Sequence, residues 1–260
     1  MSVIAQAGAK GRQLHKFGGS SLADAKCYLR VAGIMKEYSQ AGDMMVVSAA
    51  GSTTNQLISW LKLSQSDRLA AHQVQQSLRR YHTELIGGLL EPAAADTLIA
   101  AFIHDLERLA GLLDGGVSEA VYAEVVGHGE VWSARLMAAV LNQLGMEAAW
   151  LDARAFLRAE RAAQPQVDEG LSYPLLQQLM AQHPNKRLVV TGFISRNQAG
   201  ETVLLGRNGS DYSATQIGAL AGASRVTIWS DVAGVYSADP RKVKDACLPV
   251  SYTHLRAHET

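Results

Sequence analysis

Two glycine-rich turns constrain the fold more than any other feature of this sequence. KFGGSS at 16–21 and GRNGSD at 206–211 each follow a short extended run and precede apolar residues that recur at helical spacing. After the first turn these residues are Leu22, Ala25, Leu29, Ala32 and Met35, and after the second Ala214, Ile217 and Leu220. Strand–turn–helix units of this kind predict an α/β fold with a mainly parallel sheet covered by helices on both faces.

The rest of the sequence alternates in the same way and predicts one α/β domain. A turn, NQAGE, inside 195–205 predicts a hairpin, and 232–241 is predicted to be a polar loop. Helical spacing dominates 55–145, with breaks at Gly87-Gly88, Pro92 and Gly115-Gly116, and returns at 171–182. Strands are predicted at 13–17, 44–49, 148–152, 187–194 and 225–230.

Two local features of the helices are also predictable. Ser21 with Asp24 three residues later resembles a capping box at the start of the first helix. Three histidines, His72, His82 and His104, are expected at solvated helix positions.

Composition excludes several classes of protein. The 260 residues carry 24 basic and 24 acidic side chains, so no global positive charge recruits nucleic acid. The hydrophobic content of 48% is too high for a disordered chain, and no apolar run is long enough to predict a membrane span or a secretory signal. Two cysteines, Cys27 and Cys247, fit a reducing compartment, and a cytoplasmic protein is expected.

Both glycine turns are candidate anion sites. Free N–H groups at a helix start favour an anion, and Lys16 stands at the end of the strand before the first turn. In the second turn, Arg207 offers a planar fork for a carboxylate or phosphate, and Asp211 lies in the first turn of the helix. The alternative for the first turn is a tight turn with a solvated Lys16. The alternative for Asp211 is an acid that only stabilises the helix dipole.

Two further segments carry polar groups. A strand that ends in Ser230-Asp231 leads into a loop with Tyr236 and Arg241, which is the right place for nucleotide contacts in a parallel sheet, although a loop capped by Asx turns is the alternative. VGHGE at 126–130 lacks the spacing of a zinc site, and Glu130 near a helix start is instead a candidate to hold an ammonium group.

Taken together, these motifs resemble the aspartokinases of the amino-acid kinase superfamily. The matching segments are KFGGSS at 16–21, SAAGSTTN at 48–55, VGHGE at 126–130, TGFISRNQAGETVLLGRNGSDYSA at 191–214 and WSDVAGVYSADPR at 229–241. With Asn208, the second turn looks like that of the bifunctional aspartokinase–homoserine dehydrogenases, and the wider sequence looks most like the kinase region of the bacterial methionine-pathway members of that group. The resemblance implies a three-layer αβα sandwich around an eight-stranded, mainly parallel sheet.

The resemblance also implies a reaction, in which ATP with Mg²⁺ phosphorylates the side-chain carboxylate of L-aspartate. Lys16 is expected to bridge the phosphates and Asp211 to orient it as the second catalytic residue. The expected ATP-binding residues are Lys16, Gly18, Gly19, Ser20, Ser230, Asp231, Tyr236 and Arg241, and the expected substrate-binding residues are Thr54, Glu130, Arg207, Gly209 and Ser210. No protein metal site is expected.

The resemblance covers residues 12–248, which are expected to form a partial catalytic domain. Residues 249–260 (PVSYTHLRAHET) are expected to be a non-native tail, and the chain is expected to show little or no kinase activity by itself. A homo-oligomer is expected for the full-length family member. The alternatives are another amino-acid kinase, acting on glutamate, N-acetylglutamate or carbamate, and an inactive fragment that binds nucleotide or amino acid.

Overall fold

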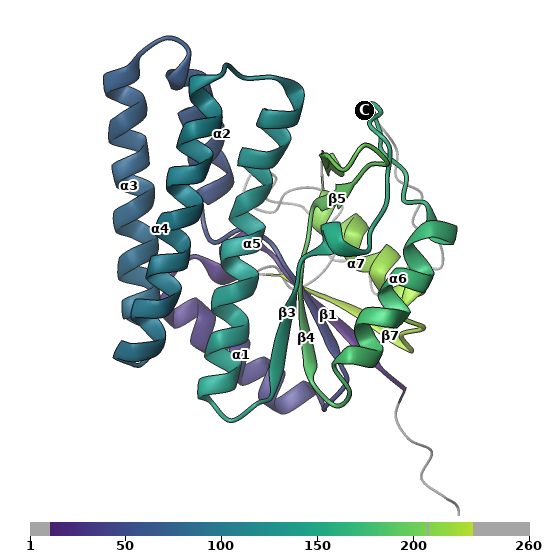
Figure 1. Cartoon of the computed structure of the whole chain (residues 1–260). Helices are drawn as coiled ribbons and strands as arrows, with labels where there is room; N and C mark the ends of the chain where they lie inside the picture. The colour runs from purple at the N-terminus through teal and green to yellow at the C-terminus, as the bar shows by residue number, and fades with distance from the viewer. Residues whose placement is uncertain (1–10, 207, 231–260) are drawn as a thin grey trace, which may run out of the picture. The chain divides into compact units, whose positions relative to one another are not determined.

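The computed structural model describes residues 11–206 and 208–230. The chain divides into two compact units, Met1–Trp229 and Ser230–Thr260, and the first of them contains all the helices and strands described below. The centre of this first unit is a parallel sheet of five strands in the order β3-β4-β2-β1-β7 (Figure 1). The strands are β1 (Gln13–Phe17), β2 (Met44–Val47), β3 (Ala148–Leu151), β4 (Arg187–Thr191) and β7 (Arg225–Trp229).

Helices cover both faces of this sheet (Figure 1). One face carries α1 (Ala25–Tyr38), α2 (Thr53–Ser64), α3 (Arg68–Gly87), α4 (Pro92–Asp114) and α5 (Glu119–Gln143). The other face carries α6 (Glu169–Gln182) and α7 (Gly209–Leu220), and two short 3₁₀ turns are η1 (Gly19–Leu22) and η2 (Ala153–Ala155). This arrangement confirms the predicted α/β fold.

The alternation of side chains along each strand explains why apolar runs form the sheet. Met45 and Val47 enter the core beneath α1–α5, whereas Met44 and Val46 enter the core beneath α6 and α7. Because successive side chains of a strand point to opposite faces, a strand covered on both sides must be apolar at every position. Phe17 lies opposite Val47 and Trp229, so the carboxyl ends of β1, β2 and β7 meet at one edge of the sheet.

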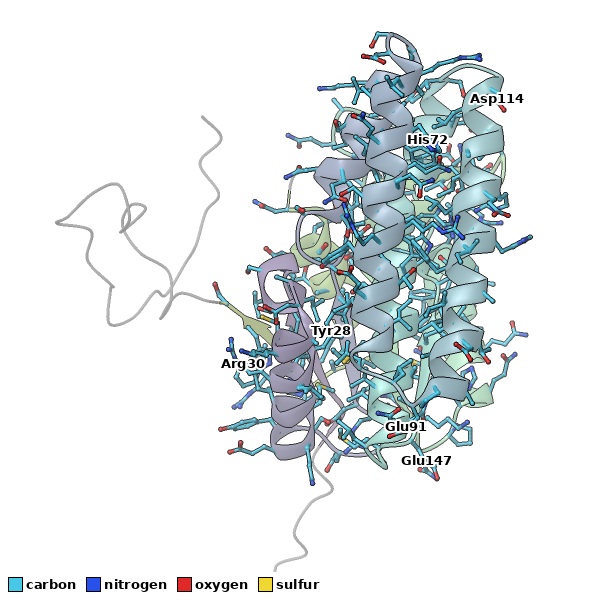
Figure 2. All side chains as sticks on the ribbon, turned by 90° about the vertical axis from the view of Figure 1, so that its left-hand side faces the viewer. Tyr28, Arg30, His72, Glu91, Asp114 and Glu147 are labelled. Carbon is cyan, nitrogen blue, oxygen red and sulfur yellow. The ribbon has the colours of Figure 1, made fainter. Side chains whose placement is uncertain are left out.

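The outer surface of the helical layer consists of α3 and α4, which pack side by side. Figure 2 shows His72 and Asp114 toward one end of this pair and Glu91 toward the other. Each helix begins at a residue that suits it: Pro92 occupies the first turn of α4, and Asp67 accepts a hydrogen bond from the Ala70 N–H at the start of α3. Among the helices of the described residues, none combines the length and apolar character needed to span a bilayer.

The first helix differs from its prediction in two respects. Its N-cap is Asp24, which accepts from the Cys27 N–H at 2.8 Å, whereas Ser21 lies in η1 and makes no capping box. The helix therefore starts later, and its buried face includes Tyr28 and Val31 while Leu29 is 49% exposed. Of the predicted face, Leu22, Ala32 and Met35 are buried, so the prediction is wrong for Leu29 alone, whose place in the core is taken by Tyr28 and Val31.

The predicted strand at 187–194 is two strands. β4 ends at Thr191, and β5 (Ile194–Arg196) pairs antiparallel with β6 (Thr202–Leu204) as the predicted hairpin. The chain turns at Gly192 and at Phe193, whose φ of +66° is left-handed and therefore costly for a bulky residue. The described residues thus hold five parallel strands and a two-stranded hairpin, and the eight-stranded sheet implied by the family resemblance stays a prediction.

The region 55–145 is helical as predicted, with one further break between α2 and α3. His72 and His104 are exposed, but the prediction for His82 was wrong because this side chain is buried among aromatic rings. The predicted loop at 232–241 and the tail at 249–260 lie outside the described residues.

Candidate active site

A pocket of about 300 Å³ lies where the chain leaves the carboxyl ends of β1 and β2. Its walls come from five segments: the turn after β1, the loop after β2 with the first turn of α2, the middle of α5, the turn after β4, and the residues that lead into α7. Ligands of parallel α/β sheets bind at this edge, so the pocket is the candidate site. Of the predicted site residues, it brings together Lys16, Gly18, Gly19, Thr54, Glu130, Gly209, Ser210 and Asp211.

The two glycine turns meet in this pocket through an ion pair. Lys16 Nζ lies 2.6 Å from Asp211 Oδ1, although the two residues are far apart in the sequence. Lys16 stands one residue before the end of β1, and it points to the α7 side of the sheet like Leu14 two residues before it. The pair holds the ammonium group beside the pocket, where it is able to meet a negatively charged ligand.

The start of α7 adds backbone donors. Asn208 is the N-cap residue and has a left-handed φ of +56°, a conformation that asparagine tolerates better than most residues. Its side chain does not cap the helix. The N–H groups of the first turn and the helix dipole therefore favour an anion at this end of the pocket.

Glu130 supplies a buried carboxyl group on the opposite wall. Its Oε1 accepts from the Ala49 N–H at 3.3 Å, and its Oε2 has no hydrogen-bond partner among the described residues. Burial raises the pKa of Glu130 to about 8, since the charged form is poorly solvated there. A carboxyl group with one oxygen free, lining a pocket, is suited to receive an ammonium group.

A glycine lets Glu130 come this close to the loop after β2. A Cβ atom at Gly129 would lie 2.7 Å from the Ala49 Cβ and 3.3 Å from the Thr53 Cγ2. Any larger residue would push α5 away from this loop, and the hydrogen bond from Ala49 to Glu130 would lengthen. The two glycines on either side of His128 thus let neighbouring side chains pack closely against the backbone of α5.

His82 holds the same loop from the other side. The Thr53 hydroxyl donates to the Ala50 carbonyl at 2.6 Å, so it accepts from His82 Nε2 at 3.1 Å. Burial lowers the pKa of His82 to about 3, which keeps the ring neutral with its hydrogen on Nε2. Thr53 directly precedes the pocket residue Thr54, so His82 helps to fix the position of Thr54.

Some predicted site residues lie elsewhere. Ser20 is exposed in η1 and does not line this pocket. Ser230 is the last described residue and belongs to the second unit. Arg207, Asp231, Tyr236 and Arg241 lie outside the described residues, so their roles stay predictions.

The pocket also contains residues to which the sequence analysis gave no role at the site, although they lie in the motif segments. These residues are Phe193, Ser48, Ala49, Gly51 and Asn208. The ring of Phe193 packs against Gly209, where a Cβ atom would approach it to 2.5 Å. The one sequence signal for the turn after β4 was Gly192 followed by the aromatic Phe193 at the end of an apolar run.

Comparison with known proteins identifies relatives of nearly the whole chain. The chain is 86% identical over 248 residues to the bifunctional aspartokinase/homoserine dehydrogenase 2 of Escherichia coli K12, which covers 95% of this chain and 31% of that protein. It is 34% identical over 236 residues to the aspartokinase of Chlamydia pneumoniae, covering 90% of this chain and 50% of that protein. The chain thus spans about a third to a half of the length of these curated relatives.

A solved structure shares the fold over most of the chain. The crystal structure of E. coli aspartokinase III in complex with aspartate and ADP (R-state) matches with a TM-score of 0.81 and 29% identity, over 90% of this chain and 52% of that one. The model of the amino acid kinase family matches residues 11–258. With a parallel αβα sheet, two glycine turns at one edge and a family match across nearly its whole length, the chain belongs to the amino acid kinase family.

Proposed function

We propose that this chain forms the catalytic region of an aspartate kinase, which transfers the γ-phosphoryl group of ATP to the side-chain carboxylate of L-aspartate. The products are 4-phospho-L-aspartate and ADP, and the reaction is the entry step toward lysine, threonine and methionine. One observation supports the proposal most: the Lys16–Asp211 pair and the buried Glu130 line the same pocket. The pocket thereby offers a cation for phosphate and an acid for an amino group.

The chemistry requires no strong base. A carboxylate oxygen of aspartate is already ionised near pH 7, and it forms the new bond to the γ-phosphorus while the bond from that phosphorus to the β–γ bridging oxygen breaks. ADP leaves with the electron pair, and no proton changes place. Catalysis therefore consists of positioning the two substrates and neutralising the charge of the transferring group.

Lys16 would stabilise the transferring phosphoryl group. Its ammonium stands at the end of β1, beside the turn where Gly18 and Gly19 line the pocket, and Ser20 follows in the same turn. Asp211 would orient this lysine rather than accept a proton, because its Oδ1 is already 2.6 Å from Lys16 Nζ. Ser230, Asp231, Tyr236 and Arg241 are proposed to hold the nucleotide.

Glu130 would bind the amino group of aspartate. When an ammonium group enters, the proton held by Glu130 leaves and the carboxylate forms an ion pair in place of a buried neutral acid. Thr54, Gly209 and Ser210 line the pocket and would bind the rest of the substrate, and Arg207 would grip a carboxylate with two parallel hydrogen bonds.

Mg²⁺ is proposed to arrive with ATP. The carboxylates of the described lining residues are Glu130 and Asp211, and Asp211 is paired with Lys16. This donor set fits an ion that keeps phosphate and water ligands and needs few from the protein. When bound, such an ion neutralises phosphate charge.

A coupled assay of ADP release with L-aspartate tests the proposal, run beside calorimetry with L-aspartate and with ADP. Because little turnover is expected of this chain by itself, the expected result is a low rate of ADP release that depends on aspartate and does not occur with glutamate or N-acetylglutamate. Binding of both ligands without turnover would instead support the alternative of a binding fragment. Turnover with another amino acid alone would contradict the proposed substrate.

A further inference from the structure

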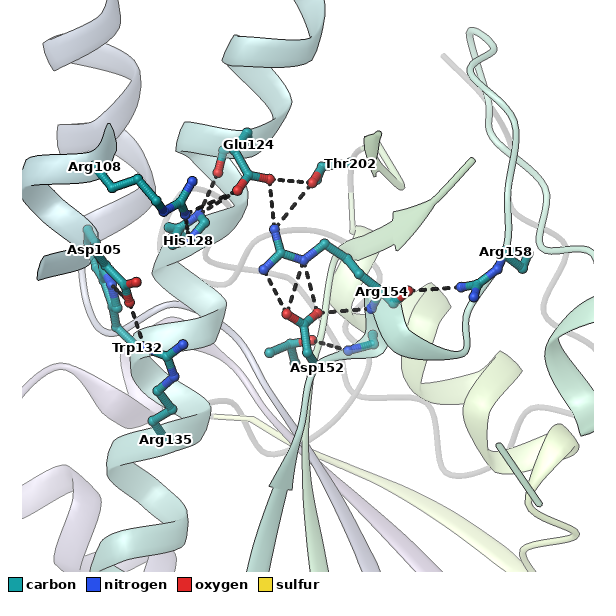
Figure 3. A network of polar contacts seen from close by, with 12 residues as sticks. Asp105, Arg108, Glu124, His128, Trp132, Arg135, Asp152, Arg154, Arg158 and Thr202 are labelled. Atoms are coloured by element: carbon teal, nitrogen blue, oxygen red, sulfur yellow. Dashed lines mark hydrogen bonds and ion pairs between the residues drawn. The ribbon is translucent and has the colours of Figure 1, made fainter. Parts of the chain in front are cut away.

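A cluster of polar side chains around Arg154 and Glu124, some buried and some half-buried, lies outside the lining of the candidate pocket (Figure 3). Arg154, which is 8% exposed, follows the end of β3 in η2 and reaches across to α5 and β6. Its Nη1 donates to Glu124 Oε2 at 2.8 Å and to Thr202 Oγ1 at 3.2 Å. Its Nε and Nη2 donate to the carboxylate of Asp152, with Nη2 at 2.7 Å from Oδ2.

The side chains of this cluster serve as hydrogen-bond donors and acceptors for one another. The Thr202 hydroxyl donates to Glu124 Oε2 at 2.6 Å, so its oxygen is free to accept from Arg154. Burial alone would raise the pKa of Glu124, but Arg154, the Thr202 hydroxyl, His128 and Arg108 together outweigh that effect and hold the pKa below its ordinary value. Glu124 is therefore a carboxylate, and three elements, α5, η2 and β6, are tied together through it.

A second set of hydrogen bonds joins the cluster to α4. Arg108 is always protonated and donates to His128 Nε2 at 2.7 Å, so His128 carries its hydrogen on Nδ1 and donates it to the Glu124 carbonyl at 2.7 Å. Arg108 also donates to Glu124 Oε1 at 3.2 Å. Both nitrogens of His128 are thus engaged in holding α5, and this histidine takes part in the same cluster as Glu124.

Two of the elements joined by this cluster, α5 and β6, also position the residues proposed to bind the amino acid: α5 carries Glu130, and β6 leads to Ser210. Glu130 lies six residues after Glu124 on α5, about 9 Å along the helix axis. Thr202 begins β6, which leads through Leu205 to the turn that holds Ser210, and the Leu205 N–H donates to the carbonyl of Phe193 at 2.8 Å. A Cβ atom at Gly127 would lie 2.7 Å from Ile194 Cγ2, so α5 touches the hairpin directly.

We propose that Arg154 is a positioning residue for the amino-acid acceptor: by holding Glu124 on α5 against Thr202 on β6, it fixes the distance between Glu130 and the residues Gly209 and Ser210 at the start of α7. The inference rests on the proposed function, because it assigns Glu130, Gly209 and Ser210 to the acceptor. The cluster makes its hydrogen bonds to α4, α5, η2 and β6, and the nucleotide end of the pocket, at Lys16 and Gly18, lies on β1 and the turn after it. The effect of Arg154 is therefore selective for the acceptor.

Calorimetric binding of L-aspartate and of ADP to the full 260-residue chain tests this role. Arg154→Gln removes the guanidinium group that binds Glu124 and Asp152. Its affinity for aspartate is expected to fall by about 10-fold or more, because a shift of about 1 Å in a positioning group has effects of this size. The affinity for ADP is expected to stay within about 2-fold. Thr202→Val, which keeps the shape and removes one hydroxyl, is expected to weaken aspartate binding less and serves if Arg154→Gln does not fold.

Arg135→Gln is the matched control. Arg135 lies on α5, like Glu124, and pairs with Asp105 of α4 at 2.5 Å, in a set of contacts separate from those of Arg154 (Figure 3). This variant is expected to bind both ligands like the parent chain. Parent-like aspartate affinity in Arg154→Gln, or equal losses for aspartate and ADP in Arg154→Gln or Thr202→Val, would overturn the inference. A parent chain that binds ADP but not aspartate would overturn the proposed function first.

Discussion

Burial moves the pKa of Glu130 far from that of an exposed glutamate. This residue is a carboxylic acid at 3% exposure, with a hydrogen bond to one oxygen and no cation beside it among the described residues. Burial raises its pKa to about 8 from an ordinary value of 4.5. In the pocket without ligand, Glu130 is therefore a neutral acid near neutral pH. At that pH it ionises only when a positively charged ligand binds beside it.

Glu130→Gln tests this state through the pH dependence of stability. Between about pH 4.5 and 8 the folded parent keeps a proton that the unfolded chain has lost, so its free energy of unfolding falls as pH rises, by up to about 1.4 kcal/mol per unit from this group. The glutamine variant lacks that decline. Urea denaturation of both proteins from pH 5 to pH 9 measures the difference, and parallel stability curves would contradict the buried neutral acid.

Lys16→Ala tests the other charged wall of the pocket. The ammonium group at the end of β1 is proposed to neutralise charge that develops on the phosphoryl group, and the loss of one such donor costs about 100-fold or more in turnover. Steady-state ADP release with aspartate measures the effect. Lys26→Ala, an exposed lysine on α1, is the control and should keep parent turnover. Near-parent turnover of Lys16→Ala would remove Lys16 from its proposed role.

At the scale of elements, α5 decides the shape of the site. It is buried along most of its length and touches the loop after β2 on one side and the hairpin on the other. Both close contacts occur at glycines, on the two sides of His128. The helix therefore sacrifices some intrinsic helix propensity at these positions in exchange for close packing.

Gly129→Ala is expected to destabilise the fold by about 1–3 kcal/mol, since its Cβ would overlap with Ala49 and overpacking costs this much. Gly111→Ala in α4 is the matched control, because a Cβ there meets nothing within 4 Å. It should stabilise by about 0.5–1 kcal/mol through helix propensity alone. Equal effects of the two changes in urea denaturation would show that α5 is not in close contact with the loop.

At the scale of the whole molecule, the site joins the two ends of the described chain. Lys16 lies on β1, which pairs with both β2 and β7, and its partner Asp211 comes from the last described helix. A ligand that bridges these walls must stabilise the complete fold and not one part of it. The described unit is therefore expected to unfold in one step when ligand is bound.

L-Aspartate with ADP is expected to raise the melting temperature. A ligand at 100 times its dissociation constant adds about 2.7 kcal/mol, and for a chain of this size that corresponds to about 5–10 °C. Succinate, which lacks the amino group, is the control and should add no stabilisation beyond that of ADP. Thermal scans of the parent that give the same shift with succinate as with aspartate would contradict the role of Glu130.

The sequence by itself determined the types of the elements and the two glycine turns, because hydrophobic spacing and turn residues act within a few residues of the chain. It also indicated Lys16 and Asp211, since each stands where a strand meets a helix. The break at Gly192–Phe193 was missed, because the apolar run continues through it and only the pairing of β5 with β6 ends the first strand. The boundary near residue 248 stays a prediction.

Only the tertiary structure decided the states of the polar groups. Burial of His82, the raised pKa of Glu130 and the joining of Arg154 to Glu124 and Thr202 all depend on elements that are distant in the sequence. Hydrophobic spacing tells which side of a helix faces inward, but not which helix or strand meets it there. Whether a buried polar group is charged, neutral or paired depends on that second surface, and the surface exists only once the chain has folded.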